Sequence, residues 1–224
     1  MADAKTWLPP DKLSPNQVRV TNVTGDGNCL FYCLLQGNEN VEQVMDLRRT
    51  LMNYLTEKRH DQTQDSPYTW EWWTMNAIDD RNNQARAGDG VGWIPISSFE
   101  DYTKGMLSST PNAPTTRWGD YLEILLYAMR YQQNVAVYQM IDGQYKSMEQ
   151  YPFGAHPSGS SNDWHLLFRT HNHYMILTIE TTSEKRAREA KPKQTSTLRD
   201  NDRAIQVIHP FKKPSPVSCS LPKR

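Results

Sequence analysis

The sequence predicts an α+β (α/β) domain in which a central β-sheet is flanked by helical regions. Two observations lead to this prediction. Apolar residues recur at helical spacing between residues 29 and 131, and short runs rich in Val, Ile, Leu and Tyr follow between residues 135 and 179. One earlier strand is expected at 17–23, where Val18 and Val20 alternate with polar residues. The order of one strand, several helices and then a sheet is typical of α+β proteins.

The helices are predicted from periodicity and from their ends. Residues 29–35 are apolar throughout and are followed by Gly37, which favours a short buried helix with a glycine stop. Residues 39–59 carry Val, Met and Leu at helical spacing, the pattern of an amphipathic helix. Further helices are expected at 99–107 and 118–131, together with a helical lobe that begins near Trp70 and leads into a polar, Gly-rich loop near Trp93.

Four strands are predicted after the last of these helices. β-Branched and aromatic residues mark them, and Asp142-Gly143 supplies the turn between the first two. The expected strands are 135–138, 144–147, 164–168 and 173–179.

Composition divides the chain into three parts. Residues 1–16 lack periodicity and form a lead-in loop, residues 17–182 form the globular body, and residues 183–224 form a basic tail that we expect to be flexible. The chain has 25 basic and 25 acidic residues, so a basic tail leaves an acidic body. An acidic body suits a partner with a basic surface, although simple solvation is the commoner reason for acidic residues.

The composition also argues against several classes of protein. No run reaches the roughly 20 apolar residues that span a bilayer, and residues 1–10 lack the apolar core of a secretory signal. Three cysteines are an odd number, which favours free thiols in a reducing compartment. We therefore expect an intracellular protein in the cytoplasm, or in the host cytoplasm if it is viral or bacterial. Nucleic-acid binding by the tail is disfavoured because Phe211 is its one aromatic residue.

Cys29 is the strongest candidate for a reactive residue. It follows Gly25-Asp26-Gly27-Asn28, between the first predicted strand and the first predicted helix. A thiol at a helix N-terminus faces unpaired N–H groups, which favour the thiolate and can bind an oxyanion. The glycines allow the tight turn that presents these groups. A buried structural cysteine beside a simple turn explains the same residues about equally well.

A thiolate nucleophile needs a histidine base, and two of the six histidines in the chain are plausible candidates for that role. Polar or loop segments hold His60, His156 and His209, and His165 begins a strand. His171 and His173 remain, at the start of the last strand, where residues two apart share a face. The spacing alone does not choose between them.

A zinc site is the main alternative use of the same side chains. Cys29 and Cys33 on a helix, with His171 and His173 on a strand, would supply four ligands of the types that zinc prefers. However, Cys33 lies in an apolar run beside Leu34, and structural zinc cysteines usually occur as C-x2-C pairs. We therefore expect no metal and assign Cys33 to the core.

Three separated motifs resemble those of ovarian-tumour (OTU) domain cysteine proteases. Asp26-Gly27-Asn28-Cys29-Leu30-Phe31 resembles the nucleophile motif of that family. Its helical segment is matched by Tyr102-x-x-x-Met106, followed by Trp118-Gly119-x-x-x-Glu123 and Ala128, and its histidine segment by Asn172-His173-Tyr174. The motifs occur in the family's order, and the resemblance covers roughly residues 18 to 180.

The resemblance implies an OTU-like, papain-type cysteine protease fold and a deubiquitinase, which hydrolyses the (iso)peptide bond after the C-terminal glycine of ubiquitin or a ubiquitin-like modifier. Carried over by position, Cys29 is the nucleophile, His173 the general base and Asp26 the aspartate of the active-site loop. The backbone N–H groups of Asp26, Gly27, Asn28 and Cys29 would form the oxyanion hole. Ubiquitin or polyubiquitin is the implied partner, and no cofactor is needed.

One position departs from the family pattern. Many members carry Asp or Asn two residues after the histidine to orient the imidazole, whereas this chain has Met175. Asp26, Asn172 or a backbone carbonyl are the candidates to replace that group; otherwise the site is a dyad of Cys29 and His173. The departure also motivates an alternative function, a catalytically inactive ubiquitin-binding module. Tyr174, the aromatic residue after the histidine, is a candidate for substrate binding.

The helical lobe holds four tryptophans, Trp70, Trp72, Trp73 and Trp93. Exposed aromatic side chains anchor interfaces, so Trp93 is a second candidate for substrate binding. For at least two of the four, packing in the core of the lobe is the expected role.

Overall fold

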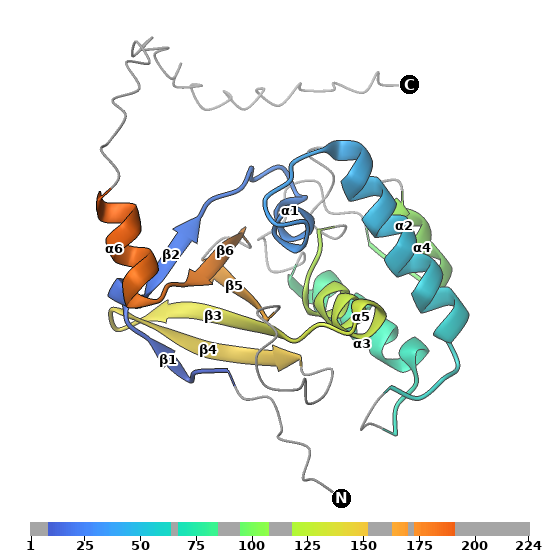
Figure 1. The fold of residues 1–224 in the computed structure, drawn as a ribbon. Coiled ribbons are helices and arrows are strands. Elements are labelled where there is room, and N and C mark those ends of the chain that lie inside the picture. Colours follow the sequence, from blue (N-terminus) through green and yellow to red (C-terminus); the bar gives the residue numbers. More distant parts are fainter. Residues whose placement is uncertain are drawn as a thin grey trace, which may run out of the picture.

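A computed structural model of the chain describes residues 9–63, 67–84, 95–107, 118–151, 163–169 and 173–190. Within these ranges the chain forms six α-helices and one six-stranded sheet (Figure 1). The α+β fold class predicted from the sequence is confirmed.

Five helices follow the sequence prediction closely. They are α1 (Cys29–Leu34), α2 (Val41–Lys58), α3 (Trp70–Gln84), α4 (Phe99–Leu107) and α5 (Tyr121–Tyr131). Helices α2 to α5 form a lobe beside the sheet, and α1 lies between this lobe and the sheet (Figure 1). The start of α2 is fixed by Asn40, whose side chain accepts the Gln43 N–H at 3.1 Å.

The strands form one mixed sheet in the spatial order β1-β4-β3-β5-β6-β2. They are β1 (Lys12–Leu13), β2 (Val18–Thr21), β3 (Val135–Ile141), β4 (Gln144–Tyr151), β5 (Trp164–Arg169) and β6 (His173–Ile179). β3 and β5 run parallel, and the other neighbouring pairs are antiparallel. The four strands predicted after the helices are present. The prediction of a plain loop at 1–16 is wrong for β1, which is only two residues long and shows no alternation.

The sheet has to curl strongly. β1 and β2 form its two edges, yet only residues 14–17 separate them in the chain, and Pro15–Gln17 form a short 3-10 helix. Six flat strands about 4.8 Å apart would place the edges about 24 Å from each other. Five residue steps span at most about 18 Å. The curl encloses a small core made of Leu13, Val18, Ala136, Tyr138, Tyr145, Leu167, Met175 and Leu177.

A larger core fills the space between the sheet and the helices. All six residues of α1 are buried in it, as expected for a helix that is apolar on every side. Trp70 is 2% exposed and Trp73 packs against the same core, which confirms core packing for two of the tryptophans. Trp72 is 40% exposed. Trp93 lies outside the described residues.

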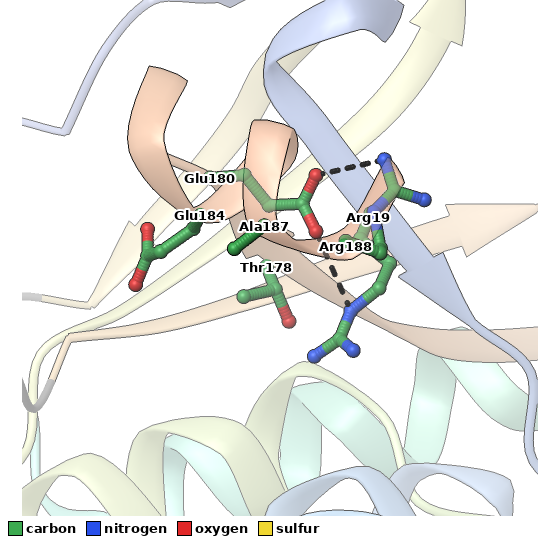
Figure 2. Close-up of a pocket in the computed structure, with 6 residues that line it drawn as sticks. All are labelled: Arg19, Thr178, Glu180, Glu184, Ala187 and Arg188. Atoms are coloured by element: carbon green, nitrogen blue, oxygen red, sulfur yellow. Dashed lines mark ion pairs between the residues drawn. The ribbon is translucent and has the colours of Figure 1, made fainter. Parts of the chain in front are cut away.

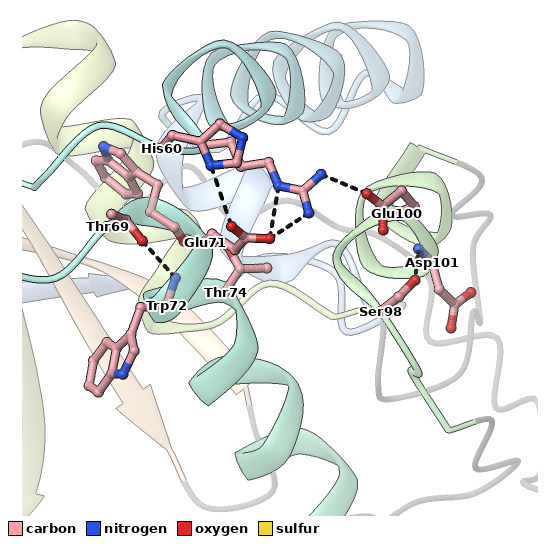
Figure 3. A network of polar contacts seen from close by, with 10 residues as sticks. His60, Thr69, Glu71, Trp72, Thr74, Ser98, Glu100 and Asp101 are labelled. Atoms are coloured by element: carbon pink, nitrogen blue, oxygen red, sulfur yellow. Dashed lines mark hydrogen bonds and ion pairs between the residues drawn. The ribbon is translucent and has the colours of Figure 1, made fainter.

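Polar contacts at Glu71 and Glu100 join three helices of the lobe (Figure 3). Arg59, at the end of α2, donates to Glu71 on α3 at 3.0 Å and to Glu100 on α4 at 2.6 Å. His60 lies 3.4 Å from Glu71, and the Arg59 guanidinium stacks 4.4 Å from the centre of the Phe99 ring. These carboxylates are at least a third exposed, so screening by solvent keeps the contribution of each ion pair to stability small.

Helix α6 (Thr182–Ala190) occupies the start of the segment predicted as a tail. Thr181 and Glu184 cap it reciprocally: the Thr181 hydroxyl accepts the Glu184 N–H, and the Glu184 carboxylate accepts the Thr181 N–H. Glu180 lies between Arg188 at 3.0 Å and Arg19 of β2 at 3.9 Å. The rest of the tail lies outside the described residues, and no helix within them is long and apolar enough to cross a membrane.

A pocket of about 320 Å³ lies between α6 and the ends of β2 and β6 (Figure 2). It is lined by Arg19, Thr178, Glu180, Glu184, Ala187 and Arg188. His173 begins β6, whereas Thr178 lies near the end of that strand. The pocket is therefore well separated from the histidine along the strand.

Candidate active site

The N-terminus of α1 lies against the start of β6. Cys29 is the first residue of α1, and its Sγ accepts the backbone N–H of Tyr174 at 3.5 Å. Tyr174 directly follows His173 in the same strand. The fold therefore brings together two motifs that lie 145 residues apart in the sequence.

The His173 imidazole lies between the loop before Cys29 and Asn22. A Cβ atom placed on Gly25 would lie 3.5 Å from His173 Nδ1, and His173 Nε2 lies 2.9 Å from Asn22 Oδ1. Because an amide oxygen can only accept a hydrogen bond, Nε2 carries the proton in the neutral ring. Nδ1, the nitrogen on the side of the cysteine loop, is then the basic one. His171 and Asn172 lie outside the described residues.

Asn22 supplies the hydrogen-bond acceptor for the His173 imidazole that Met175 cannot supply. β2 and β6 pair Thr21 with Ile176, and the same register continued by one residue sets Asn22 opposite Met175. Directly opposite residues point to the same face of a sheet, so Asn22 reaches the histidine from the neighbouring strand. The sequence analysis missed this residue. The signal was present, because Asn22 continues the alternation of Val18 and Val20.

Asp26 shapes the loop and does not bond the histidine. Its Oδ1 accepts the Asn28 N–H at 3.0 Å, and its Oδ2 accepts the Tyr32 hydroxyl at 2.8 Å. The two bonds join the loop to the first turn of α1. The role of Asp26 in orienting His173 stays a prediction, whereas the contact with His173 Nε2 that the structure describes is made by Asn22.

One of the four predicted oxyanion donors already has a partner within the loop. The Asn28 N–H is directed at Asp26 Oδ1. Gly27 has φ of 89°, a backbone conformation that is strained for any residue with a Cβ atom. A Cβ there would also lie 2.6 Å from Trp118 Nε1. Only glycine fits this position.

The Trp118-Gly119 motif packs directly on the cysteine loop and α1. Trp118 contacts Gly27, and a Cβ on Gly119 would lie 2.7 Å from Leu30 and 2.8 Å from Phe31. The close approach of the segment before α5 to the nucleophile motif therefore explains why a glycine stands at position 119. α5 itself begins with a capping box between Asp120 and Glu123.

Burial governs the ionisation of Cys29. The residue is 6% exposed, and burial raises the pKa of its thiol above the ordinary value. Backbone N–H groups of Tyr174, Leu30 and Cys29 lower that pKa, and the charge of Asp26 raises it further. The expectation that the helix N-terminus favours the thiolate is therefore outweighed by desolvation.

The histidine is shifted in the opposite direction. Burial, and then the positive charge of Arg169, lower the pKa of His173 below its ordinary value. Both shifts favour the uncharged forms at neutral pH. These directions correspond to an uncharged thiol at Cys29 and an uncharged imidazole at His173.

Tyr174 contributes its backbone and not its ring to the site. Its side chain is 5% exposed, its hydroxyl donates to Asp120 at 3.1 Å, and its ring lies 5.0 Å from that of Phe168. The prediction that Tyr174 binds substrate is not supported by this buried position. Its N–H group is the part that reaches Cys29.

Cys33 is a core residue, as expected. It is fully buried, and burial raises the pKa of its thiol strongly. Among the described residues no group of three or more His, Cys, Asp or Glu side chains is arranged to hold a metal ion. His171, one of the four ligands of the zinc alternative, lies outside them.

A cysteine at a helix N-terminus, close to a histidine that an amide holds in place, is a site suited to thiol chemistry. Residues 24–175 match the sequence profile of the family described as OTU-like cysteine protease. The chain belongs to this family.

Solved structures of OTU domains are similar to this chain at low sequence identity. The OTU of Hazara virus, bound to ubiquitin, is 14% identical, with a TM-score of 0.47, and the match covers 80% of this chain and 98% of that chain. The viral OTU protease of Taggert virus is 14% identical, with a TM-score of 0.49 and coverage of 82% and 98%. An OTU deubiquitinase from Wolbachia pipientis wMel, bound to ubiquitin, is 18% identical, with a TM-score of 0.46 and coverage of 74% and 98%. No curated protein sequence matches the chain.

Proposed function

We propose that the protein is a thiol-dependent deubiquitinase that hydrolyses the (iso)peptide bond after the C-terminal glycine of ubiquitin or a ubiquitin-like modifier. The observation that carries the proposal is the contact between α1 and β6, in which Cys29 Sγ accepts the Tyr174 N–H beside His173. Membership of the OTU-like cysteine protease family supports the chemistry. The motif resemblance described above supplies the substrate class.

Acylation begins from the neutral pair. As Cys29 Sγ attacks the carbonyl carbon of the terminal glycine, His173 Nδ1 takes the thiol proton, so that a thiolate never has to exist alone in the buried site. The charge that develops on the carbonyl oxygen is held by loop N–H groups, with Gly27 and Cys29 as the donors we assign. Asn22 holds Nε2–H and thereby stabilises the imidazolium that forms.

Collapse of the tetrahedral intermediate breaks the C–N bond. The imidazolium of His173 gives its proton to the leaving amine, which leaves as a neutral lysine side chain or peptide amine. Water then attacks the thioester while His173 accepts one of its protons. The Cys29 sulfur regains a proton as it leaves, and the pair returns to its resting state.

The alternative function is an inactive ubiquitin-binding module. It was motivated by Met175, which cannot orient the histidine. Asn22, the residue after the end of β2, bonds His173 at 2.9 Å and supports the active enzyme over this alternative. We therefore assign Cys29 as nucleophile, His173 as base and Asn22 as orienting acceptor.

Covalent labelling with a ubiquitin carrying a C-terminal electrophile tests the proposal. The wild-type protein is expected to form a single adduct, and Cys29→Ala to form none. Cys33→Ala is the matched control, because it removes the neighbouring buried thiol and leaves the site. Failure of the wild type to react, or an adduct that persists in Cys29→Ala, would refute the proposal. Cleavage of a panel of differently linked di-ubiquitins and of one ubiquitin-like conjugate would then define the preferred substrate.

A further inference from the structure

Arg48 is a fully buried cation next to the candidate active site. It lies in the middle of α2 and is 0% exposed, and its guanidinium stacks 3.9 Å from the centre of the Phe31 ring on α1. Its Nη1 donates to the Met106 carbonyl of α4 at 3.4 Å. Burying a charge is unfavourable unless hydrogen bonds compensate for it. Besides this bond to α4, Arg48 donates two hydrogen bonds to the cysteine loop.

Arg48 and Asp26 hold opposite edges of one peptide group. Arg48 Nη2 donates to the Gly27 carbonyl at 3.4 Å, and Asp26 Oδ1 accepts the Asn28 N–H at 3.0 Å. In a trans peptide these two groups point in opposite directions. Together the two bonds fix the rotation of the Gly27–Asn28 peptide. That rotation determines where the flanking N–H groups of Gly27 and Cys29 point.

The Asn28 side chain adds a second connection. Its Oδ1 accepts Arg48 Nη2 at 2.7 Å. The Asp26 carboxylate is held in turn by the Tyr32 hydroxyl, which donates to Asp26 Oδ2 at 2.8 Å. Burial and Asp26 raise the pKa of Tyr32 to about 12, so it remains a donor at neutral pH. Burial lowers the pKa of Arg48 to about 10, so Arg48 remains charged.

We propose that Arg48 is a positioning residue, which holds the Gly27–Asn28 peptide in the orientation that directs the flanking N–H groups at the carbonyl oxygen of the substrate. The inference rests on the proposed function. Arg48 acts through the loop and does not touch the substrate. Its loss should therefore lower kcat, which depends on the oxyanion donors, more than KM.

Turnover and simple alkylation together test this role. Hydrolysis of a ubiquitin C-terminal fluorogenic amide needs an oxyanion hole, whereas alkylation of Cys29 by iodoacetamide develops no carbonyl oxyanion. For Arg48→Gln we expect kcat to fall about 100-fold, the loss typical of one oxyanion donor, with KM and the alkylation rate changed less than about 2-fold. Arg49→Gln is the matched control, since Arg49 is exposed and pairs only with Asp46 among the described residues.

A second pair of variants keeps the test decisive if Arg48→Gln does not fold. Arg48→Lys retains the charge and loses the planar fork, and Asn28→Ala removes one acceptor of that fork. If Arg48 acts through the loop, the double variant that combines Arg48→Lys with Asn28→Ala loses less kcat than the product of the two single losses. Multiplicative losses, an unchanged kcat, or equal falls in turnover and alkylation would overturn the inference. A wild type that hydrolyses no ubiquitin substrate would instead overturn the proposed function, and this inference with it.

Discussion

Replacing Asn22 with alanine removes one hydrogen bond from the candidate active site and leaves the backbone of β2 in place. The bond joins two neutral groups at 2.9 Å, in an exposed setting where water can compete. Such a bond contributes about 0.5–1.5 kcal/mol, which corresponds to a fall of about 2- to 13-fold in kcat/KM. Removal of the buried aspartate of a serine protease triad costs about 10⁴-fold. We therefore expect a measurable but modest loss in Asn22→Ala.

The assay is hydrolysis of a ubiquitin C-terminal fluorogenic amide across pH 5 to 10. Asn22→Asp complements the alanine variant, because a carboxylate beside His173 favours the imidazolium and raises its pKa. In the wild type the lowered pKa of His173 places the acidic limb of kcat/KM below about pH 6.5, because the base has to be neutral. Asn22→Asp is expected to move this limb to higher pH. Wild-type activity in Asn22→Ala together with an unmoved limb in Asn22→Asp would refute the assignment of Asn22.

Three further predictions concern the loop, the thiol and the lobe. Gly27→Ala should lower kcat at least 10-fold, because φ is 89° and Trp118 Nε1 would lie 2.6 Å from the new Cβ. Gly143→Ala is the control and should keep wild-type kcat, because Gly143 also has a positive φ, of 74°, but its new Cβ would meet no atom within 4 Å. The rate of Cys29 alkylation by iodoacetamide should still be rising at pH 9, because burial raises the pKa of the thiol; a plateau below pH 7 would indicate a thiolate–imidazolium pair. Glu123→Gln should lower the free energy of unfolding in urea by about 3–5 kcal/mol, because it removes the buried negative charge that lies 2.6 Å from Arg81, whose side chain is 5% exposed. A loss below about 1 kcal/mol would contradict this.

The larger elements could be predicted because their apolar patterns are long and regular. α2 and α5 lie within three residues of the predicted bounds, and so does β6. β1 could not be found because two residues show no period. α6 has no apolar stripe, although its capping pair Thr181 and Glu184 stands in the sequence at the usual spacing.

For the candidate site, the sequence predicts the two reactive residue types but not their burial or their supporting contacts. The motifs located Cys29 and His173, but nothing in the sequence measures burial, and burial raises the pKa of the thiol against the effect of the helix N-terminus. Asn22 was missed because its role depends on the register between β2 and β6. Arg48 was missed because the sequence alone does not distinguish a buried arginine in an amphipathic helix from an exposed one. The neighbouring residues Arg48 and Arg49 are one of each kind.

Among the residues that the structure describes, the edge strand β2 pairs only with β6. This arrangement orders events during synthesis on the ribosome. The segment with the cysteine emerges early, whereas its partner strand and the histidine emerge some 145 residues later. Until then β2 has no neighbour and the thiol has no base. A nascent or truncated chain that ends before residue 173 is therefore expected to be inert toward ubiquitin conjugates, and full reactivity arrives only when the last strand docks.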